Sequence, residues 1–128
     1  MKPAPFDYVR PCDLGEVIDL LATHGSDARI LSGGQSMVAM LNMRVVTPKL
    51  LVDIGGLRDM DYIRDAGDHI AIGCTTRQRS LEQWTGLAQK LPLLAKVLPW
   101  VGHVQTRSRG TVCGSIAHAD PSSELPLC

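Results

Sequence analysis

Two adjacent glycines, Gly33 and Gly34, follow directly after a short apolar run. The run at residues 28–31 is typical of a strand, and the methionine and leucine residues at 37–41 have the spacing of a brief helix. Glycine permits a tight turn between the two because it has no Cβ. A further apolar stretch at 49–54 predicts a buried strand. The sequence therefore predicts a strand, a glycine turn, a helix and a second strand in succession.

The residues before this turn complete a β-α-β-turn-α-β arrangement. Alternating apolar and polar residues at 6–10 predict a strand, and residues 14–24 carry apolar side chains at helical spacing. Asp13 with Glu16 three positions later is typical of a capping box, and Gly25 stands where a left-handed C-terminal cap belongs. We therefore expect a well-defined amphipathic helix at 14–24.

The second part of the chain has a different pattern. Residues 61–73 predict a hairpin around the turn at 66–68. Thr75 or Thr76 is then expected to cap a helix that reaches about Trp84. Three further segments follow: helical spacing at 87–101, a polar stretch with two glycines at 103–120, and the opening of another helix at 121–124.

Length and charge narrow the classes of function. The 128 residues suffice for one core but not for two independent domains, and a helix that opens just before the last residue indicates a truncated domain. The 13 basic and 13 acidic residues cancel, so we expect neither nucleic acid nor an anionic membrane surface as a partner. No signal peptide and no membrane span is visible, so a cytoplasmic location is expected.

The cysteines and histidines predict no metal site. The four cysteines are scattered without a C-x-x-C pair, and the four histidines lack the helical spacing of metal ligands. We expect reduced thiols and no bound metal.

Two glycine-containing stretches, residues 32–36 and 110–115, carry the chemistry. The first, Ser-Gly-Gly-Gln-Ser, lets consecutive backbone N–H groups point at a ligand, which suits a pyrophosphate. The alternative is a tight turn in which glycine only supplies a positive φ. Neither G-x-G-x-x-G nor G-x-x-x-x-G-K-[ST] occurs, so a Rossmann or P-loop site has no support.

The run from His103 to Glu124, which contains Arg-Gly-Thr-Val-Cys-Gly-Ser and Ala-His-Ala-Asp-Pro, resembles the FAD-binding (medium) subunit of molybdenum hydroxylases. These are the carbon monoxide dehydrogenase-like enzymes, and the sequence is similar also to the flavin domain of xanthine dehydrogenase. The resemblance covers essentially the whole chain, because further matching segments occur in the same order at 6–8, 28–36, 51–54 and 72–76.

This resemblance implies an α+β fold, the two-lobed FAD-binding fold of the vanillyl-alcohol oxidase type, with non-covalent FAD. Residues 1–56 would form the first β-α-β lobe and residues 57–128 an incomplete second lobe. Backbone amides would hold the pyrophosphate, and an acidic residue would hydrogen-bond the cofactor. The cofactor-binding residues that the resemblance implies are Arg29, Ile30, Leu31, Ser32, Gly33, Gly34, Gln35, Ser36, Val101, Gly102, Gly110, Thr111, Val112, Cys113, Gly114, Ser115, His118 and the acidic Glu124.

The resemblance also implies electron transfer, with no catalytic residue in this chain. FAD would take electrons from the [2Fe-2S] clusters of a small partner subunit and pass them to an acceptor, after substrate is oxidised at molybdopterin in a large partner subunit. Two alternatives remain open: a truncated, non-catalytic remnant that cannot retain FAD, and a stand-alone flavin oxidase of the same fold.

Cys113 departs from the family pattern, which usually has glycine there. If that position needs a positive φ, cysteine costs about 1 kcal/mol or more and weakens FAD binding. His118 either hydrogen-bonds the cofactor or caps a loop, and Arg107 and Arg109 either meet phosphate or are solvated in an exposed loop. The side chains expected to fill the core or an interface are Met37, Met40, Met43, Cys74, Trp84, Trp100 and Cys113 itself.

Overall fold

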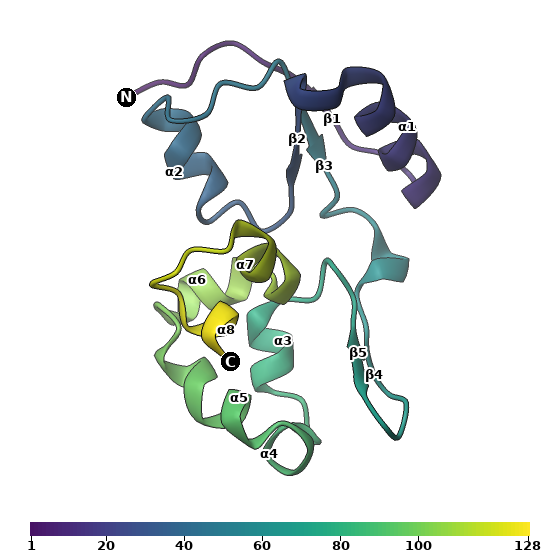
Figure 1. The fold of residues 1–128 in the computed structure, drawn as a ribbon, viewed down its shortest axis with the longest axis vertical. Coiled ribbons are helices and arrows are strands. Elements are labelled where there is room, and N and C mark those ends of the chain that lie inside the picture. Colours follow the sequence, from purple (N-terminus) through teal and green to yellow (C-terminus); the bar gives the residue numbers. More distant parts are fainter. The chain divides into compact units, whose positions relative to one another are not determined.

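The computed structural model describes residues 1–128, which divide into two compact units, Met1–Arg58 (unit 1) and Asp59–Cys128 (unit 2). Figure 1 shows the helices and strands of both units, coloured along the chain. Both combine helices with strands, which confirms the expected α+β class. The assignment of residues 1–56 and 57–128 to two lobes of one FAD-binding domain stays a prediction.

Unit 1 contains a three-stranded parallel sheet in the order β1-β3-β2. The outer strands β1 (Asp7–Val9) and β2 (Ala28–Leu31) both pair with β3 (Leu50–Asp53). The first three residues of β3 are apolar and buried, as is typical of a parallel strand that is covered on both faces. The three strands expected from the sequence are confirmed, two of them slightly shorter than expected.

Helix α1 (Leu14–His24) confirms the bounds that its sequence predicts. Asp13 Oδ1 accepts a hydrogen bond from the Glu16 N–H at 2.9 Å, and Gly25 ends the helix with a φ of +52°. The return bond of the capping box is displaced by one residue, because Glu16 Oε2 accepts from the Cys12 N–H at 2.8 Å. Local signals therefore set both ends of this helix.

Apolar side chains on the helices of unit 1 are less buried than the sequence predicts. In α1 only Val17 is buried, and Ile18 is 57% exposed. The brief helix after the glycine turn is confirmed as α2 (Met37–Asn42), which buries Leu41. Met43 directly after it is 54% exposed, so core filling is wrong for Met43.

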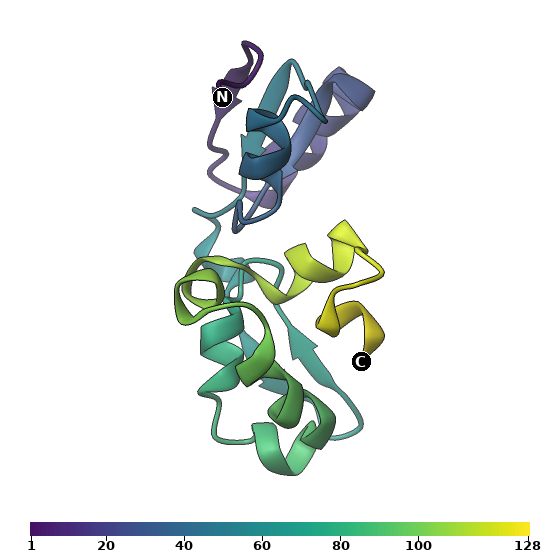
Figure 2. The ribbon, with the colours of Figure 1, turned by 90° about the vertical axis from the view of Figure 1, so that its left-hand side faces the viewer.

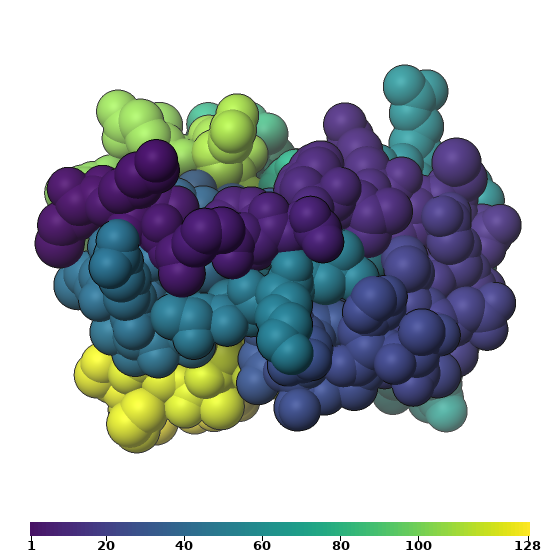
Figure 3. Space-filling view, turned by 90° about the horizontal axis from the view of Figure 1, so that it is seen from above, coloured from purple at the N-terminus to yellow at the C-terminus, as the bar shows by residue number.

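The N-terminal segment lies on the surface of unit 1, beside the blue segment that carries α2 (Figure 3, dark purple). Arg44, just after α2, donates from Nε to the Lys2 carbonyl at 3.1 Å. This bond joins residues that are 42 positions apart in the sequence.

Unit 2 begins with a hairpin and continues as a series of short helices (Figure 2). The strands β4 (Ile63–Asp65) and β5 (Ile70–Ile72) pair antiparallel, which confirms the predicted hairpin. None of the helices in the structure is both long and apolar enough to cross a membrane. The helices of unit 2 are α3 (Gln78–Glu82), α4 (Leu87–Lys90), α5 (Pro92–Val97), α6 (Val104–Arg109), α7 (Val112–His118) and α8 (Glu124–Leu127).

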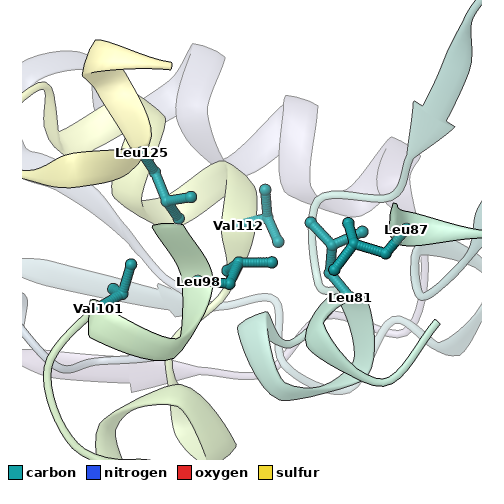
Figure 4. Packing of buried hydrophobic residues seen from close by; sticks show 6 residues of the cluster. All are labelled: Leu81, Leu87, Leu98, Val101, Val112 and Leu125. Carbon is teal, nitrogen blue, oxygen red and sulfur yellow. The ribbon is translucent and has the colours of Figure 1, made fainter. Parts of the chain in front are cut away.

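The core of unit 2 joins these short helices into one cluster (Figure 4). Leu81 of α3 and Leu98 of the 3-10 turn Leu98–Trp100 have no exposed surface, and Leu125 of α8 belongs to the same cluster. Trp84 packs against the cluster as expected, but Trp100 is 80% exposed. A core position is therefore wrong for Trp100, and its role at an interface stays a prediction.

The helices of unit 2 correct several sequence-based expectations. Neither Thr75 nor Thr76 caps α3, because Arg77 is its N-cap and makes no capping bond. The helical spacing at 87–101 corresponds to α4, α5 and the 3-10 turn, since the ring of Pro92 cannot continue a hydrogen-bonded helix. The polar stretch at 103–120 contains α6 and α7, which the sequence does not predict. The helix expected to open at 121–124 is confirmed as α8.

Candidate functional site

The first glycine stretch leaves the sheet of unit 1 at its carboxyl edge. Leu31, the last residue of β2, pairs with Asp53, the last residue of β3, and the Ile54 N–H donates to the Leu31 carbonyl at 2.9 Å. Residues 32–36 follow at once and lead into α2. Ligands of parallel sheets bind outside the carboxyl ends of the strands, so this loop occupies a position suited to binding.

The loop at 32–36 keeps several backbone donors open. The N–H groups of Gly33, Gly34 and Gln35 have no acceptor within the chain. Gly34 has a φ of +73°, a conformation that a residue with a Cβ rarely adopts. Gln35 Nε2 donates to the Gly33 carbonyl at 3.2 Å, which holds the loop from inside. The loop therefore presents three consecutive N–H donors on a turn that needs glycine.

The neighbours of this loop differ in what they can offer a ligand. Arg29 donates from Nη1 to the carbonyls of Ser26 and Ala28 at 2.9 and 2.8 Å, so its charge lies at the start of β2 and the loop follows the other end. Ile30 is 42% exposed and Leu31 is half-buried. Arg29 can therefore contribute its backbone to the loop, while its guanidinium is occupied elsewhere.

A tyrosine and an aspartate that the sequence analysis did not single out lie at the same edge of the sheet. The Tyr8 hydroxyl donates to Asp53 Oδ2, and Asp53 Oδ1 accepts from the Gly55 N–H at 2.8 Å. The hydrogen bond to Asp53 raises the pKa of Tyr8 above its ordinary value, so the phenol stays protonated. Tyr8 and Asp53 are brought together by the parallel pairing of β1 and β3, and only this pairing could have pointed to them.

The second glycine stretch is not a loop but the start of helix α7. Two hydrogen bonds join it to the chain at the start of α3: the Gln78 N–H donates to the Gly110 carbonyl at 2.9 Å, and the Val112 N–H donates to the Thr76 carbonyl at 3.0 Å. Thr111 then caps α7, because its Oγ1 accepts from the Gly114 N–H at 3.1 Å. Most of its backbone donors are therefore used within the chain.

Position 110 requires glycine because neighbouring atoms approach it closely, and not because of its backbone angles. Its φ is −63°, but a Cβ there would lie 3.0 Å from the Thr106 carbonyl oxygen and 3.3 Å from Gln78 Oε1. Gln78 is 5% exposed, and its Oε1 is buried without a hydrogen-bond partner. An unpaired buried acceptor is rare in proteins, so the packing beside Gly110 is tight and polar.

Cys113 lies inside α7, so the concern about a positive φ at this position is unfounded. The half-buried thiol donates to the Ile72 and Gly73 carbonyls, with Sγ 3.7 and 3.6 Å from the two oxygens. Burial raises the pKa of the Cys113 thiol, with a smaller contribution from Cys74. Cys113 therefore packs as a thiol, as the sequence analysis expects.

The other expected site residues occupy different surroundings in unit 2. Val101 and Val112 are buried in the core cluster, so only their backbones can meet a ligand. Gly102, next to Val101, has a φ of +51° and is exposed. Among the remaining residues, the Ser115 hydroxyl lies 3.2 Å from that of Ser123, His118 is exposed at the end of α7, and Glu124 is the half-buried first residue of α8.

Arg107 overturns its interpretation as an exposed loop arginine. It lies on α6, is 6% exposed and forms an ion pair with Glu82, with 3.0 Å between Nε and Oε2. Arg109 is exposed, as expected for a solvated arginine, but it ends a helix and does not lie in a loop. The sequence analysis missed Glu82, because no local pattern connects residues that are 25 positions apart.

Comparison with known proteins identifies the family. Residues 4–128 match the family described as the FAD binding domain in molybdopterin dehydrogenase. The chain belongs to this family. The resemblance found from the glycine stretches and their order is thereby confirmed, and an FAD-binding domain follows from it.

Relatives of known identity are subunits of dehydrogenases. The chain is 45% identical over 127 residues to the 6-hydroxypseudooxynicotine dehydrogenase complex subunit alpha of Paenarthrobacter nicotinovorans, covering 99% of this chain and 43% of that protein. It is 36% identical over 126 residues to the carbon monoxide dehydrogenase medium chain of Hydrogenophaga pseudoflava, covering 98% of this chain and 44% of the relative. The chain therefore spans less than half the length of these relatives.

Solved structures agree with this family. A carbon monoxide dehydrogenase from Hydrogenophaga pseudoflava aligns with a TM-score of 0.93 at 37% identity, over 98% of this chain and 44% of that one. A quinoline 2-oxidoreductase from Pseudomonas putida 86 aligns with a TM-score of 0.92 at 38% identity, with the same two coverages of 98% and 44%. The agreement extends over nearly all of this chain.

Proposed function

We propose that the chain binds FAD non-covalently and belongs to the electron-transfer subunit of a molybdenum hydroxylase-type complex. One observation carries the proposal: the N–H groups of residues 33–35 have no acceptor within the chain and follow the carboxyl end of a parallel strand. The proposed contacts are residues 29–36 of unit 1, together with Val101, Gly102, residues 110–115, His118 and Glu124 of unit 2. Both units would belong to one FAD-binding domain.

The loop at 32–36 fits the diphosphate of FAD by its chemistry. It carries no acidic side chain, and its open donors are backbone N–H groups that bind anions without a counter-charge nearby. Gly34 has a φ of +73°, which glycine adopts readily, and a Cβ there would lie 3.4 Å from Val38 Cγ2 and 3.5 Å from Leu31 Cδ1. The formal net charge of zero is consistent with this mode of binding, since no basic surface is needed.

The segment at 110–115 would contribute less to the diphosphate and more to the shape of the site. Among residues 112–115, only the Cys113 N–H has no hydrogen-bond acceptor within the chain. Ser115, half-buried and close to Ser123, offers a hydroxyl, and Glu124 offers a carboxylate that can accept from a ribityl or ribose hydroxyl. These groups hold and orient a polar ligand.

FAD, when bound, supplies the one- and two-electron redox chemistry. The residues of the chain bind and orient the cofactor, and the proposal assigns no catalytic acid or base to them. We propose that a molybdopterin-containing large subunit and a [2Fe-2S]-containing small subunit are the partners, and that electrons reach this chain from the iron–sulfur clusters.

Substrate recognition would belong to the partner subunits. Relatives that share this domain are named for a nicotine derivative, caffeine and carbon monoxide, at 45%, 37% and 36% identity. A domain that stays this similar beside such different substrates is suited to a shared electron-transfer step.

The experiment compares two glycines of unit 1 that both have a positive φ. Gly34→Val places a side chain on the proposed diphosphate loop, and Gly25→Val introduces the same kind of strain at the end of α1, where no atom lies within 4 Å of the added Cβ. FAD titration, followed by quenching of flavin fluorescence, should show an affinity at least about tenfold weaker for Gly34→Val than for Gly25→Val.

Circular dichroism in the far ultraviolet serves as the control for folding in both variants. Equal FAD affinity of Gly34→Val and Gly25→Val contradicts the role of the loop. A wild-type chain that takes up no FAD contradicts the proposed function as a whole.

A further inference from the structure

Arg107 is a buried cation, and its Nε, Nη1 and Nη2 groups all donate hydrogen bonds within the chain. Its Nε and Nη2 donate to the two oxygens of Glu82 at 3.0 and 3.3 Å. Its Nη1 donates to the Val101 and Gly102 carbonyls at 3.1 and 3.3 Å. A guanidinium with 6% exposure is tolerated only with such partners, because burying a charge without them is costly.

Glu82 is fixed on α3 by two arginines. Arg79, three residues earlier on the same helix, donates from Nη1 to Glu82 Oε2 at 3.0 Å. Burial by itself raises the pKa of Glu82, but the hydrogen bonds from Arg107 and Arg79 and their charges outweigh it, so the pKa lies below its ordinary value. Glu82 is therefore ionised at neutral pH and binds one edge of the Arg107 guanidinium through two hydrogen bonds.

The turn that Arg107 binds contains a glycine with a positive φ and is fixed at one end by a buried side chain. Gly102 has a φ of +51°, and the Val101 side chain is anchored in the core cluster. Arg107 draws the carbonyls of both residues toward the interior. The N–H groups of Gly102 and His103 have no acceptor within the chain. One guanidinium thus determines which way the carbonyls of this turn point, and with them the N–H groups that follow.

We propose that Arg107 is the positioning residue of the Val101–Gly102 turn, and that its bidentate bond to Glu82 holds this turn in the orientation that borders the bound FAD. The inference rests on the proposed function, in which Val101 and Gly102 contact FAD. Arg107 itself does not touch the cofactor and acts through the turn. The planar fork is essential, because one group must reach a carboxylate and two carbonyls at once, which the single ammonium of lysine does not match.

The test compares Arg107→Lys with Arg109→Lys in the full chain. Both variants keep the charge on α6, but Arg109 is exposed and its side chain forms no ion pair in the structure. The first readout, taken without FAD, is amide hydrogen exchange at Val101, whose N–H donates to the Leu98 carbonyl at 3.1 Å. Exchange should accelerate by about tenfold in Arg107→Lys and stay at the wild-type rate in Arg109→Lys.

The second readout is taken with FAD. Arg107→Lys should weaken FAD binding by about fivefold to tenfold and change the visible circular dichroism of the bound flavin, since a loosened turn no longer orients it. Arg109→Lys should leave both unchanged. If Arg107→Lys does not fold, Glu82→Gln decides, because it keeps the shape of the carboxylate but removes its charge, and the same changes are expected in weaker form.

The outcomes separate the two proposals. A wild-type chain that takes up no FAD overturns the proposed function. A second outcome overturns only the positioning role of Arg107. In that case the wild type takes up FAD, but Arg107→Lys, or its substitute Glu82→Gln, has the same exchange rate and flavin spectrum as Arg109→Lys.

Discussion

The two glycine stretches use their backbone in opposite ways. In the loop at 32–36, the N–H groups of residues 33–35 have no acceptor within the chain. In the segment at 110–115, the Val112, Gly114 and Ser115 N–H groups donate to Thr76 O, Thr111 Oγ1 and Thr111 O. The first stretch can offer its backbone to a ligand, whereas the second uses it mainly to begin α7 and join it to the segment before α3.

Their glycines also serve different purposes. Gly34 is needed for its φ of +73°, while Gly110 has an ordinary φ of −63° and is needed because other atoms approach it closely. Similar composition therefore does not imply a similar role. Substitutions in the first stretch should mainly change FAD affinity, and substitutions in the second should mainly change the stability of unit 2.

The largest expected effect of this difference on stability is at Gly110. In Gly110→Val the added Cβ would lie 3.0 Å from the Thr106 carbonyl oxygen, which cannot move without distorting α6. The free energy of unfolding should fall by about 1–3 kcal/mol, measured by urea denaturation followed by circular dichroism. Ala117→Val, on the exposed side of α7, is the control and should change it by less than about 0.5 kcal/mol. Wild-type stability in Gly110→Val would mean that this approach is not tight.

A smaller difference in stability is expected between the hydroxyl residues that precede the two helices, Thr111 before α7 and Ser36 before α2. Thr111→Ala removes the Oγ1 that caps α7 and should cost about 1 kcal/mol of unfolding free energy. Ser36 precedes α2 without any capping bond, so Ser36→Ala should cost less than about 0.5 kcal/mol and affect FAD affinity instead. Thr111→Ser, which keeps a hydroxyl, should recover most of the stability. Equal losses in Thr111→Ala and Ser36→Ala would remove the contrast between the stretches.

The smallest expected effect is at Cys113. Because this residue has helical backbone angles, Cys113→Gly relieves no strain and should lower the free energy of unfolding by about 0.5–1 kcal/mol through the greater freedom of glycine. The FAD dissociation constant should stay within about twofold of the wild type. Tighter FAD binding in Cys113→Gly would instead show that the backbone of the bound state favours glycine.

Structure that depends on local signals could be predicted from the sequence. The helix α1 is bounded by Asp13, Glu16 and Gly25, which act within a few residues of its ends. The strand β3 is recognisable because a buried parallel strand is apolar along its length. The family could be recognised because both glycine stretches and the strands between them occur in a fixed order.

Structure that depends on distant partners could not be predicted. The helix α6 buries Arg107, and the partner that permits this, Glu82, lies 25 residues earlier in the chain. Thr76 looks like an N-cap, but its hydroxyl bonds to the Tyr62 backbone, 14 residues away. In both cases a long-range hydrogen bond overrides the local preference of the residue.

The position of the tryptophans, one of them the exposed Trp100, gives the two units different optical properties. The chain has two tryptophans, Trp84 and Trp100, and both belong to unit 2. Trp84 packs against the core cluster, while Trp100, at 80% exposure, should emit at the longer wavelengths of an indole in water. Tryptophan fluorescence therefore reports on unit 2 alone. Unfolding curves recorded by this emission follow the unit that contains the second glycine stretch, and unit 1 contributes no signal to them.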